Sequence, residues 1–184
     1  FSEPDRLSPD QLARSAGDYP LELRRALARQ RSNDAILAEA IAAGRVVVGQ
    51  TSVRSASVDA PAPAEVPSVP HAMLGPDPTP FLETFPDLVQ NLPELEAAAA
   101  GRGVFTVRPD PDGIYRSVPL VMLVQDTIRL ALAPELLRVA TGGEAFAIRA
   151  NEAGVDGVVV GGQMIRTQAD GTVFPYFSPN VPDR

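Results

Sequence analysis

Residues 104–120 read Val104-Phe-Thr-Val-Arg-Pro-Asp-Pro-Asp-Gly-Ile-Tyr-Arg-Ser-Val-Pro-Leu120, and two strand-like runs flank a turn in this stretch. Valine, phenylalanine and threonine before the turn, and isoleucine, tyrosine and valine after it, favour a pleated, half-buried surface. Pro109, Pro111 and Gly113 interrupt the runs, as turn residues do. The stretch therefore predicts an antiparallel hairpin with a polar tip.

Four charged residues gather at the tip of this predicted hairpin: Arg108, Asp110, Asp112 and Arg116. They can pair with one another and brace the turn, or they can turn outward and bind a polar ligand through charge-assisted hydrogen bonds. Bracing is the more common use of surface ion pairs. Calcium binding by Asp110 and Asp112 is not expected, because the later oxygen ligands and the terminal glutamate of a calcium loop are missing. We predict no metal site.

The composition is that of an acidic chain with a sizeable core. The chain has 184 residues, of which 45% are hydrophobic, so one domain is the simplest expectation. Its net charge of -7 and its pI near 4.7 argue against a nucleic acid partner, which needs a basic face. Cysteine is absent, which excludes disulfides and thiolate nucleophiles. No apolar run approaches the roughly 20 residues needed to cross a bilayer, and no signal-peptide pattern opens the chain.

The N-terminal segment predicts short helices before the first strand. Ser8-Pro-Asp-Gln11 forms a capping box with proline at the first helical position. Leu7 and Leu12 have the spacing of a hydrophobic staple around it. Leu23 and Leu27 define one face of a second helical piece.

The clearest helix covers Ala35 to Ala43, and a strand follows it. Asn33 or Asp34 should cap this helix, whose apolar spacing predicts one buried stripe. Arg45-Val-Val-Val-Gly49 is a short β-branched run, typical of a strand buried on both faces. A helix followed by a buried strand indicates an α/β layer.

Asp34 and Gln50 are candidate ligand-binding residues because of their places around this strand. Gln50 follows the predicted carboxyl end of the strand, which is the rim where open α/β sheets bind their ligands. Asp34 begins the preceding helix. Helix capping is the competing explanation for Asp34 and the favoured one.

Residues 53–80 contain seven prolines and few large apolar residues, and they predict a long Pro-rich loop. His71, the only histidine, lies in this loop without a second histidine or a nearby nucleophile. A catalytic role for His71 is therefore not expected. Pro93 then begins another helix, which an alanine run carries to Gly101.

The C-terminal half predicts one helix among several strands. Leucines from Leu130 to Leu137 have helical spacing, with Pro134 in the first turn and Gly142-Gly143 at the end. The Gln125-Asp126 pair and the Asp170-Gly171 pair predict turns. The strand-like runs in this half are Ala145–Ile148, Val155–Val160, Gln163–Thr167 and residues 173–177. The predicted fold class is α/β, with a mixed β-sheet flanked by helices and antiparallel hairpins in the C-terminal half.

Several segments follow one another in an order that resembles a known family. They are Glu3-Pro-Asp5-Arg6, Asn33-Asp34-x-x-Leu37-Ala38-Glu39-Ala40 before Val46-Val-Val-Gly49, Gly103-Val104-Phe105, Pro109-Asp-Pro-Asp112-Gly113-Ile-Tyr-Arg116-x-Val-Pro119-Leu120, and Thr167-x-x-Asp170-Gly171-x-Val-Phe-Pro-Tyr176. Together they resemble the second class of CHASE domains, the cyclase- and histidine-kinase-associated extracellular sensing domains. The resemblance covers nearly the whole chain, and its strongest motif is the Asp-x-Asp-Gly-x-x-Arg-x-x-Pro-Leu segment that begins at Asp110.

The resemblance implies that residues 1–184 form a single extracytoplasmic sensory domain, in the periplasm, of an inner-membrane protein. The parent protein would be an adenylate or guanylate cyclase, or a histidine or serine/threonine kinase. The family normally has a further strand and helix before the Glu-Pro-Asp segment, so a piece lacking that unit is expected. The expected signal is a small molecule or a protein. A homodimer is a further expected assembly, and no cofactor is expected.

The resemblance assigns no catalytic residue, and the chain has no phosphate loop, dinucleotide loop or nucleophile elbow. We therefore expect that the chain itself is not an enzyme. The candidate ligand-binding residues are Asp5, Asp34, Gln50, Arg108, Asp110, Asp112, Arg116 and Tyr176. Two alternatives stay open: a structural dimerisation module without a small ligand, and a hydrolase that uses Asp5, Asp34 and Asp112.

Overall fold

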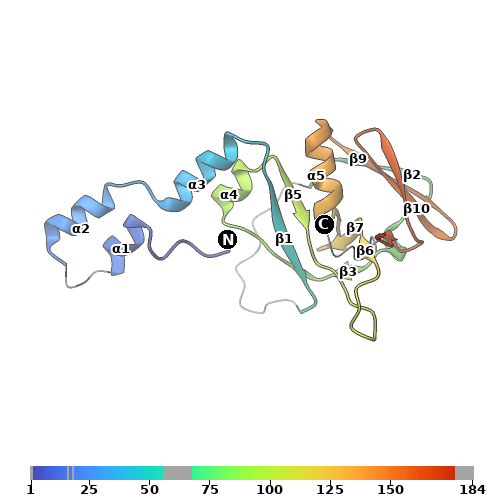
Figure 1. The fold of residues 1–184 in the computed structure, drawn as a ribbon, viewed down its shortest axis with the longest axis horizontal. Coiled ribbons are helices and arrows are strands. Elements are labelled where there is room, and N and C mark those ends of the chain that lie inside the picture. The colour runs from blue at the N-terminus through green and yellow to red at the C-terminus, as the bar shows by residue number, and fades with distance from the viewer. Residues whose placement is uncertain (1, 16, 18, 56–67, 177–184) are drawn as a thin grey trace, which may run out of the picture.

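Two larger β-sheets, a short two-stranded sheet and an arm of short helices make up much of the part of the chain that the structure describes (Figure 1). This computed structural model describes residues 2–15, 17, 19–55 and 68–176. The helices are α1 (Pro9–Ser15), α2 (Leu21–Ala28), α3 (Asn33–Ala42), α4 (Pro93–Ala98) and α5 (Leu132–Thr141), with a 3₁₀ turn at Thr79–Phe81. The strands are β1 (Val47–Val53), β2 (His71–Leu74), β3 (Thr84–Phe85), β4 (Asp87–Val89), β5 (Gly101–Val104), β6 (Val118–Pro119), β7 (Val121–Val124), β8 (Thr127–Leu130), β9 (Phe146–Asn151), β10 (Gly154–Val160), β11 (Gln163–Arg166) and β12 (Thr172–Val173).

The first sheet is mixed and continues across two groups of strands. The groups are ordered β4-β1-β5 and β3-β7-β8, and a parallel bridge between Val104 and Ala131 joins them. β1 runs parallel to β5, from Val47 opposite Gly101 to Gln50 opposite Val104. β4 is antiparallel to β1, and β7 is antiparallel to β8. The predicted mixed α/β class is confirmed.

The second sheet has the order β11-β10-β9-β2. β9, β10 and β11 are consecutive antiparallel strands, so the hairpins predicted in the C-terminal half are confirmed. β2 runs parallel to β9, with His71 opposite Phe146. The prediction of a loop throughout residues 53–80 is therefore wrong at His71–Leu74. The flanking prolines hid a short edge strand, a place where proline is tolerated. Residues 56–67 of the predicted loop lie outside the described part.

α5 packs closely against β5 because that strand has glycine at alternate positions. A Cβ on Gly101 would lie 2.3 Å from Glu135 Oε1, and a Cβ on Gly103 would lie 2.5 Å from the Cα of Leu132. A side chain at Gly103 would require the backbone of α5 to move, and one at Gly101 would displace the side chains of Glu135 and Val139. α5 ends as predicted at Gly142, whose φ of 74° is left-handed.

The alternation of side chains gives the first sheet two buried faces. One face joins the core that is shared with the second sheet and includes Val121, Leu123, Ile128 and Leu130. The opposite face has its own core, which consists of Phe85, Leu88, Val104, Met122, Val124 and Ala131. α3 and α4 extend this side of the molecule through Ile41 and Leu95, which pack with Val48.

α1 and α2 pack against each other and project from the sheets as an arm (Figure 1). α2 buries no residue. Leu7 is 74% exposed, so the predicted staple with Leu12 is not formed. Ser8 Oγ accepts a hydrogen bond from Asn33 N at 2.9 Å, which ties the start of α1 to the start of α3.

Ser32 caps α3, and the prediction of Asn33 or Asp34 as the cap is wrong. The Ser32 side chain accepts a hydrogen bond from Ala35 N at 3.0 Å. Asn33 and Asp34 lie inside the first turn instead. The predicted buried stripe is formed only in part, because Ile41 is buried and Leu37 is half-buried, whereas Ile36 and Ala40 are exposed.

Residues 105–117 form a loop, and the hairpin predicted over residues 104–120 is not formed. β5 pairs with β1, whereas β6 pairs with β12. The tip alone closes as predicted. Gly113 N donates to Asp110 O at 2.8 Å, and Asp110 N donates to Ile114 O at 2.9 Å. Local turn chemistry was readable in the sequence, but the pairing of the flanking strands depends on partners far along the chain.

The turn predicted at Gln125-Asp126 is confirmed, and it closes a hairpin between β7 and β8. Both residues have positive φ, at 51° and 57°, as two-residue hairpin turns require. β8 therefore occupies Thr127–Leu130, and the helix predicted from Leu130 begins at Leu132.

Candidate functional site

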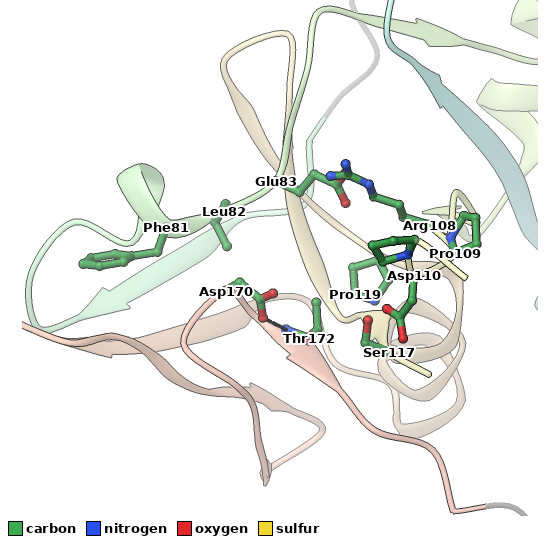
Figure 2. A pocket seen from close by; sticks show the side chains of 11 residues that line it. Phe81, Leu82, Glu83, Arg108, Pro109, Asp110, Ser117, Pro119, Asp170 and Thr172 are labelled. Atoms are coloured by element: carbon green, nitrogen blue, oxygen red, sulfur yellow. Dashed lines mark hydrogen bonds and ion pairs between the residues drawn. The ribbon is translucent and has the colours of Figure 1, made fainter. Parts of the chain in front are cut away.

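An open groove of about 510 Å³ lies beside the loop of residues 105–117 (Figure 2). Three stretches of chain line it: residues 81–83, residues from 108 to 119, and the turn at Asp170 with Thr172. The charged side chains on its walls belong to Glu83, Arg108, Asp110 and Asp170. The walls also include the hydroxyl groups of Ser117 and Thr172 and the apolar side chains of Phe81, Leu82, Pro109, Pro111 and Pro119.

The pairing of β6 with β12 builds one wall of this groove. Thr172 lies opposite Pro119, and Leu120 N donates to Gly171 O at 3.0 Å. Gly171 has a φ of 80°, and a Cβ there would lie 3.0 Å from the Val121 side chain. Glycine permits this close crossing. The crossing brings together the two motif segments of residues 109–120 and 167–176.

The acidic groups of the groove differ in how strongly the fold engages them. Asp170 Oδ1 accepts hydrogen bonds from Thr172 N at 3.0 Å and from Thr172 Oγ1 at 2.7 Å. Glu83 Oε1 lies 2.6 Å from Arg54 Nη2 but 3.7 Å from Arg108 Nη1. Arg108 is 67% exposed at this longer distance. Its guanidinium is therefore the charged group of the groove that is most available to a ligand.

Arg116 braces the tip of the loop. Its Nη1 donates to Asp110 Oδ2 at 2.8 Å and to Asp112 Oδ1 at 2.9 Å, and its Nη2 donates to Asp112 Oδ2 at 2.7 Å. This bidentate contact lowers the pKa of Asp112 below its usual range and raises the pKa of Arg116. These charges were expected either to brace the turn or to bind a polar ligand, and in the structure Arg116, Asp110 and Asp112 pair with one another and brace it. Asp110 belongs to both the brace and the groove wall.

Asp5 and Asp34 contact each other at the base of the arm, away from the groove. Asp5 N donates to Asp34 Oδ2 at 3.0 Å, and Asn33 Nδ2 donates to Asp5 Oδ2 at 2.7 Å. The hydrogen bond from Asn33 lowers the pKa of Asp5. Asp34 is buried. These contacts attach the N-terminal segment to α3, and neither residue lines the groove.

Gln50 and Tyr176 also lie outside the groove. β1 continues to Val53, so the prediction that Gln50 follows the carboxyl end of the strand is wrong. Gln50 is buried, and its Nε2 donates to Glu96 Oε1 at 3.1 Å. Tyr176 follows β12 and is fully exposed.

The three acids of the hydrolase hypothesis are not brought together. Asp5 and Asp34 lie at the base of the arm, whereas Asp112 lies on the loop of residues 105–117, which is on the other side of β1 (Figure 1). His71 stacks on Phe146, with ring centroids 5.2 Å apart. Within the described ranges, no three or more histidine, aspartate or glutamate side chains are grouped so that they could hold a metal ion.

None of the helices in the described residues has the length and apolar character needed to cross a membrane.

Sequence reasoning found half of the charged groups in the groove and missed the rest. Arg108 and Asp110 were candidates, whereas Glu83 and Asp170 were not. The sequence did offer an indication for Asp170, because this residue belongs to the turn motif of residues 167–176, one of the segments that carry the family resemblance. The sequence offered no indication for Glu83, because no local pattern shows that residues 81–83 meet the loop of residues 105–117.

The family model of the CHASE2 domain matches residues 1–182. The chain therefore belongs to the CHASE2 domain family, whose members are sensory domains of the extracellular type and not catalytic domains. The chain matches no curated protein and no solved structure.

Proposed function

We propose that this chain is the periplasmic signal-sensing domain of an inner-membrane protein and that it binds a small polar ligand in the groove of Figure 2. The bound ligand regulates a cytoplasmic nucleotide cyclase or kinase in the same protein. Membership of a sensory, extracellular-type family supports the extracytoplasmic location and the sensing role.

The observation that carries the proposal is the convergence of polar groups from separate stretches of chain on one groove. Its volume of about 510 Å³ suits a small molecule, since such sites occupy roughly 300–1,000 Å³. A ligand that contacts Arg108 and the turn at Asp170 bridges the loop of residues 105–117 to the β6–β12 pair. Such a ligand favours one position of the loop over others, which is what a conformational signal requires.

A thermal-shift screen of the chain against amino acids, amines, sugars and dicarboxylates tests this proposal. We expect at least one compound to raise the melting temperature of the wild-type chain. The same compound should have no effect on Arg108→Ala, which removes the most available charge, or on Ser117→Phe, which fills the groove. Arg149→Ala is the control, because Arg149 is an exposed arginine that pairs with Asp156 on the second sheet.

A compound that passes this screen should change the output of the intact parent protein, and Arg108→Ala should abolish that change. If no compound stabilises the chain, or if Ser117→Phe responds as the wild type does, the groove is not the sensory site.

A dimerisation module without a small ligand is the second candidate, and the arm favours it. Leu21 and Leu23 are large and exposed on α2, which buries no residue, and Tyr19 shortly before α2 is exposed as well. Residues 19–31, which include α2, carry four arginines and one glutamate on a chain of net charge -7, so this segment complements the remainder of a second copy in charge. Light scattering after size exclusion tests this candidate. Leu21→Glu should convert a dimer to a monomer if the arm forms the interface.

A further inference from the structure

A polar cluster lies within the first sheet and shares no residue with the groove. We call it the arginine cluster, and it consists of Gln50, Asn91, Glu96, Arg102 and Arg129. Gln50 and Glu96 are buried, and Arg102 and Arg129 are partly buried. Gln50 comes from β1, Arg102 from β5, Arg129 from β8 and Glu96 from α4.

The alternation of the strands puts both arginines on the same face of the sheet. Gly101 and Gly103 of β5 lie under α5, so Arg102 between them points to the opposite face. Arg129 lies across from Met122 in the β7–β8 pair, and Met122 belongs to the core on that opposite face.

Glu96 supplies the carboxylate of the arginine cluster, and other groups already engage its oxygens. Its Oε1 accepts hydrogen bonds from Gln50 Nε2 at 3.1 Å and from Asn91 N and Asn91 Nδ2, each at 2.9 Å. Its Oε2 accepts a hydrogen bond from Arg102 Nε at 3.0 Å. The cluster thus holds two guanidinium groups and one carboxylate, which contacts Arg102, so the net charge of the cluster is positive.

Arg129 is the cation of this cluster that has no contacting counter-charge among the described residues. Its Nε is the one buried side-chain nitrogen or oxygen atom among the described residues that has no hydrogen-bond partner. None of the ion pairs between described residues includes Arg129. Burial lowers the pKa of Arg129, while Glu96 raises it and Arg102 lowers it further. Removing an unpaired charge from water is costly, and a bound counter-ion offsets that cost.

We propose that the arginine cluster binds one oxyanion group, a carboxylate or a phosphate, through the guanidinium of Arg129, with Arg102 as the second nearby cation. Because Nε is sealed from solvent, the oxyanion contacts the terminal Nη pair of the partly exposed side chain. A guanidinium recognises either kind of oxyanion with two parallel hydrogen bonds. The bound group supplies the negative charge that Glu96 alone does not provide. This site is independent of the proposed sensory groove.

Thermal unfolding of the wild-type chain in phosphate, acetate and chloride, at one pH and one ionic strength, tests the proposal. Non-specific salt effects on burial act on every variant alike. We expect a saturable rise of the melting temperature in at least one oxyanion relative to chloride. Arg129→Met should weaken the apparent affinity about tenfold or more, since it removes charge-assisted hydrogen bonds. Arg149→Met, which alters an exposed arginine on the second sheet, should keep the wild-type response.

The two oxyanions distinguish the sources of the group. A response to phosphate alone indicates a phosphate ligand, and a response to acetate indicates a carboxylate. The proposal is overturned if the wild type responds to neither, or if Arg129→Met responds as the wild type does. If Arg129→Met does not fold, the ¹⁵N side-chain resonance of Arg129 in the wild-type chain gives the answer. That resonance should shift during the anion titration, and an unchanged resonance overturns the proposal.

Discussion

Glu135 of α5 is the residue whose loss we expect to destabilise the fold most. Its Oε1 accepts hydrogen bonds from Arg102 N at 3.0 Å and from Arg138 Nη2 at 2.6 Å, and its Oε2 accepts one from Arg138 Nε at 2.7 Å. Both side chains of this ion pair are buried. Glu135→Leu leaves the Arg138 guanidinium without its counter-charge, which typically costs about 3–5 kcal/mol. That loss is a large fraction of the roughly 5–15 kcal/mol by which domains are stable.

Replacing both partners separates the effect of the unpaired charge from the effect of lost packing. Glu135→Leu with Arg138→Met removes the charge altogether, and such apolar replacements of buried pairs are often neutral or stabilising. Arg138 also donates to Gly143 O at 2.6 Å, and Arg102 N loses its acceptor on Glu135. The double variant should therefore still lose about 1 kcal/mol for each of these two hydrogen bonds.

Equilibrium unfolding in urea, followed by circular dichroism, measures the four proteins of this double-mutant cycle. The double variant should be clearly more stable than Glu135→Leu. A loss below about 1 kcal/mol in Glu135→Leu, or a double variant no more stable than the single one, would refute the assignment of this pair as a buried charge-compensated contact.

Three further predictions concern the cap, the loop and catalysis. Ser32→Ala should lower the free energy of unfolding by about 1 kcal/mol, because Ala35 N loses its cap acceptor; an unchanged urea midpoint would contradict the capping role. The Asp112–Arg116 contact should stabilise the loop above the ordinary aspartate pKa of 3.8 and lose this effect as the pH falls through the lowered pKa of Asp112. An acid titration followed by the Tyr115 resonances should show this loosening, and Asp112→Asn, which is loose at every pH, should not. The isolated chain should leave nucleoside triphosphates and generic esters and phosphoesters intact, with or without divalent metal, because it has neither a thiol nor a lysine to activate; hydrolysis that disappears in Asp112→Asn would contradict the sensory assignment.

The groove and the arginine cluster give the proposed sensor two separate polar sites. The groove lies at the crossing of β6 and β12, whereas the arginine cluster lies on the face of the first sheet from which Arg102 contacts Glu96 of α4. A compound that acts through Arg108 and an oxyanion that acts through Arg129 should therefore stabilise the chain additively, since distant sites usually contribute independently.

The sequence by itself determined those elements whose signals are local. Pro93 begins α4, Gly142 ends α5 and the Gln125-Asp126 pair forms a turn, all as predicted. Proline, glycine and turn residues limit or extend the φ angles of the backbone at their own positions. The helix ends and turns that they form can therefore be predicted from the neighbouring sequence. Apolar runs bounded by such turns likewise predicted the C-terminal hairpins, because consecutive strands pair with each other.

The tertiary structure alone decided which distant segments meet. The strand-like run was predicted to begin at Val104, but Val104 ends β5, which pairs with β1 and not with the run after the Pro/Asp/Gly turn. The two glycines of β5 let α5 pack closely on this pairing. Gln50 was predicted at a rim and is buried against Glu96, since the length of β1 is set by its neighbouring strands. Among the described residues, the unpartnered Nε of Arg129 likewise depends on which distant segments pack around β8. Periodicity reports which side of an element is buried, but it does not name the partner, because each pairing is chosen by contacts between residues far apart in the chain.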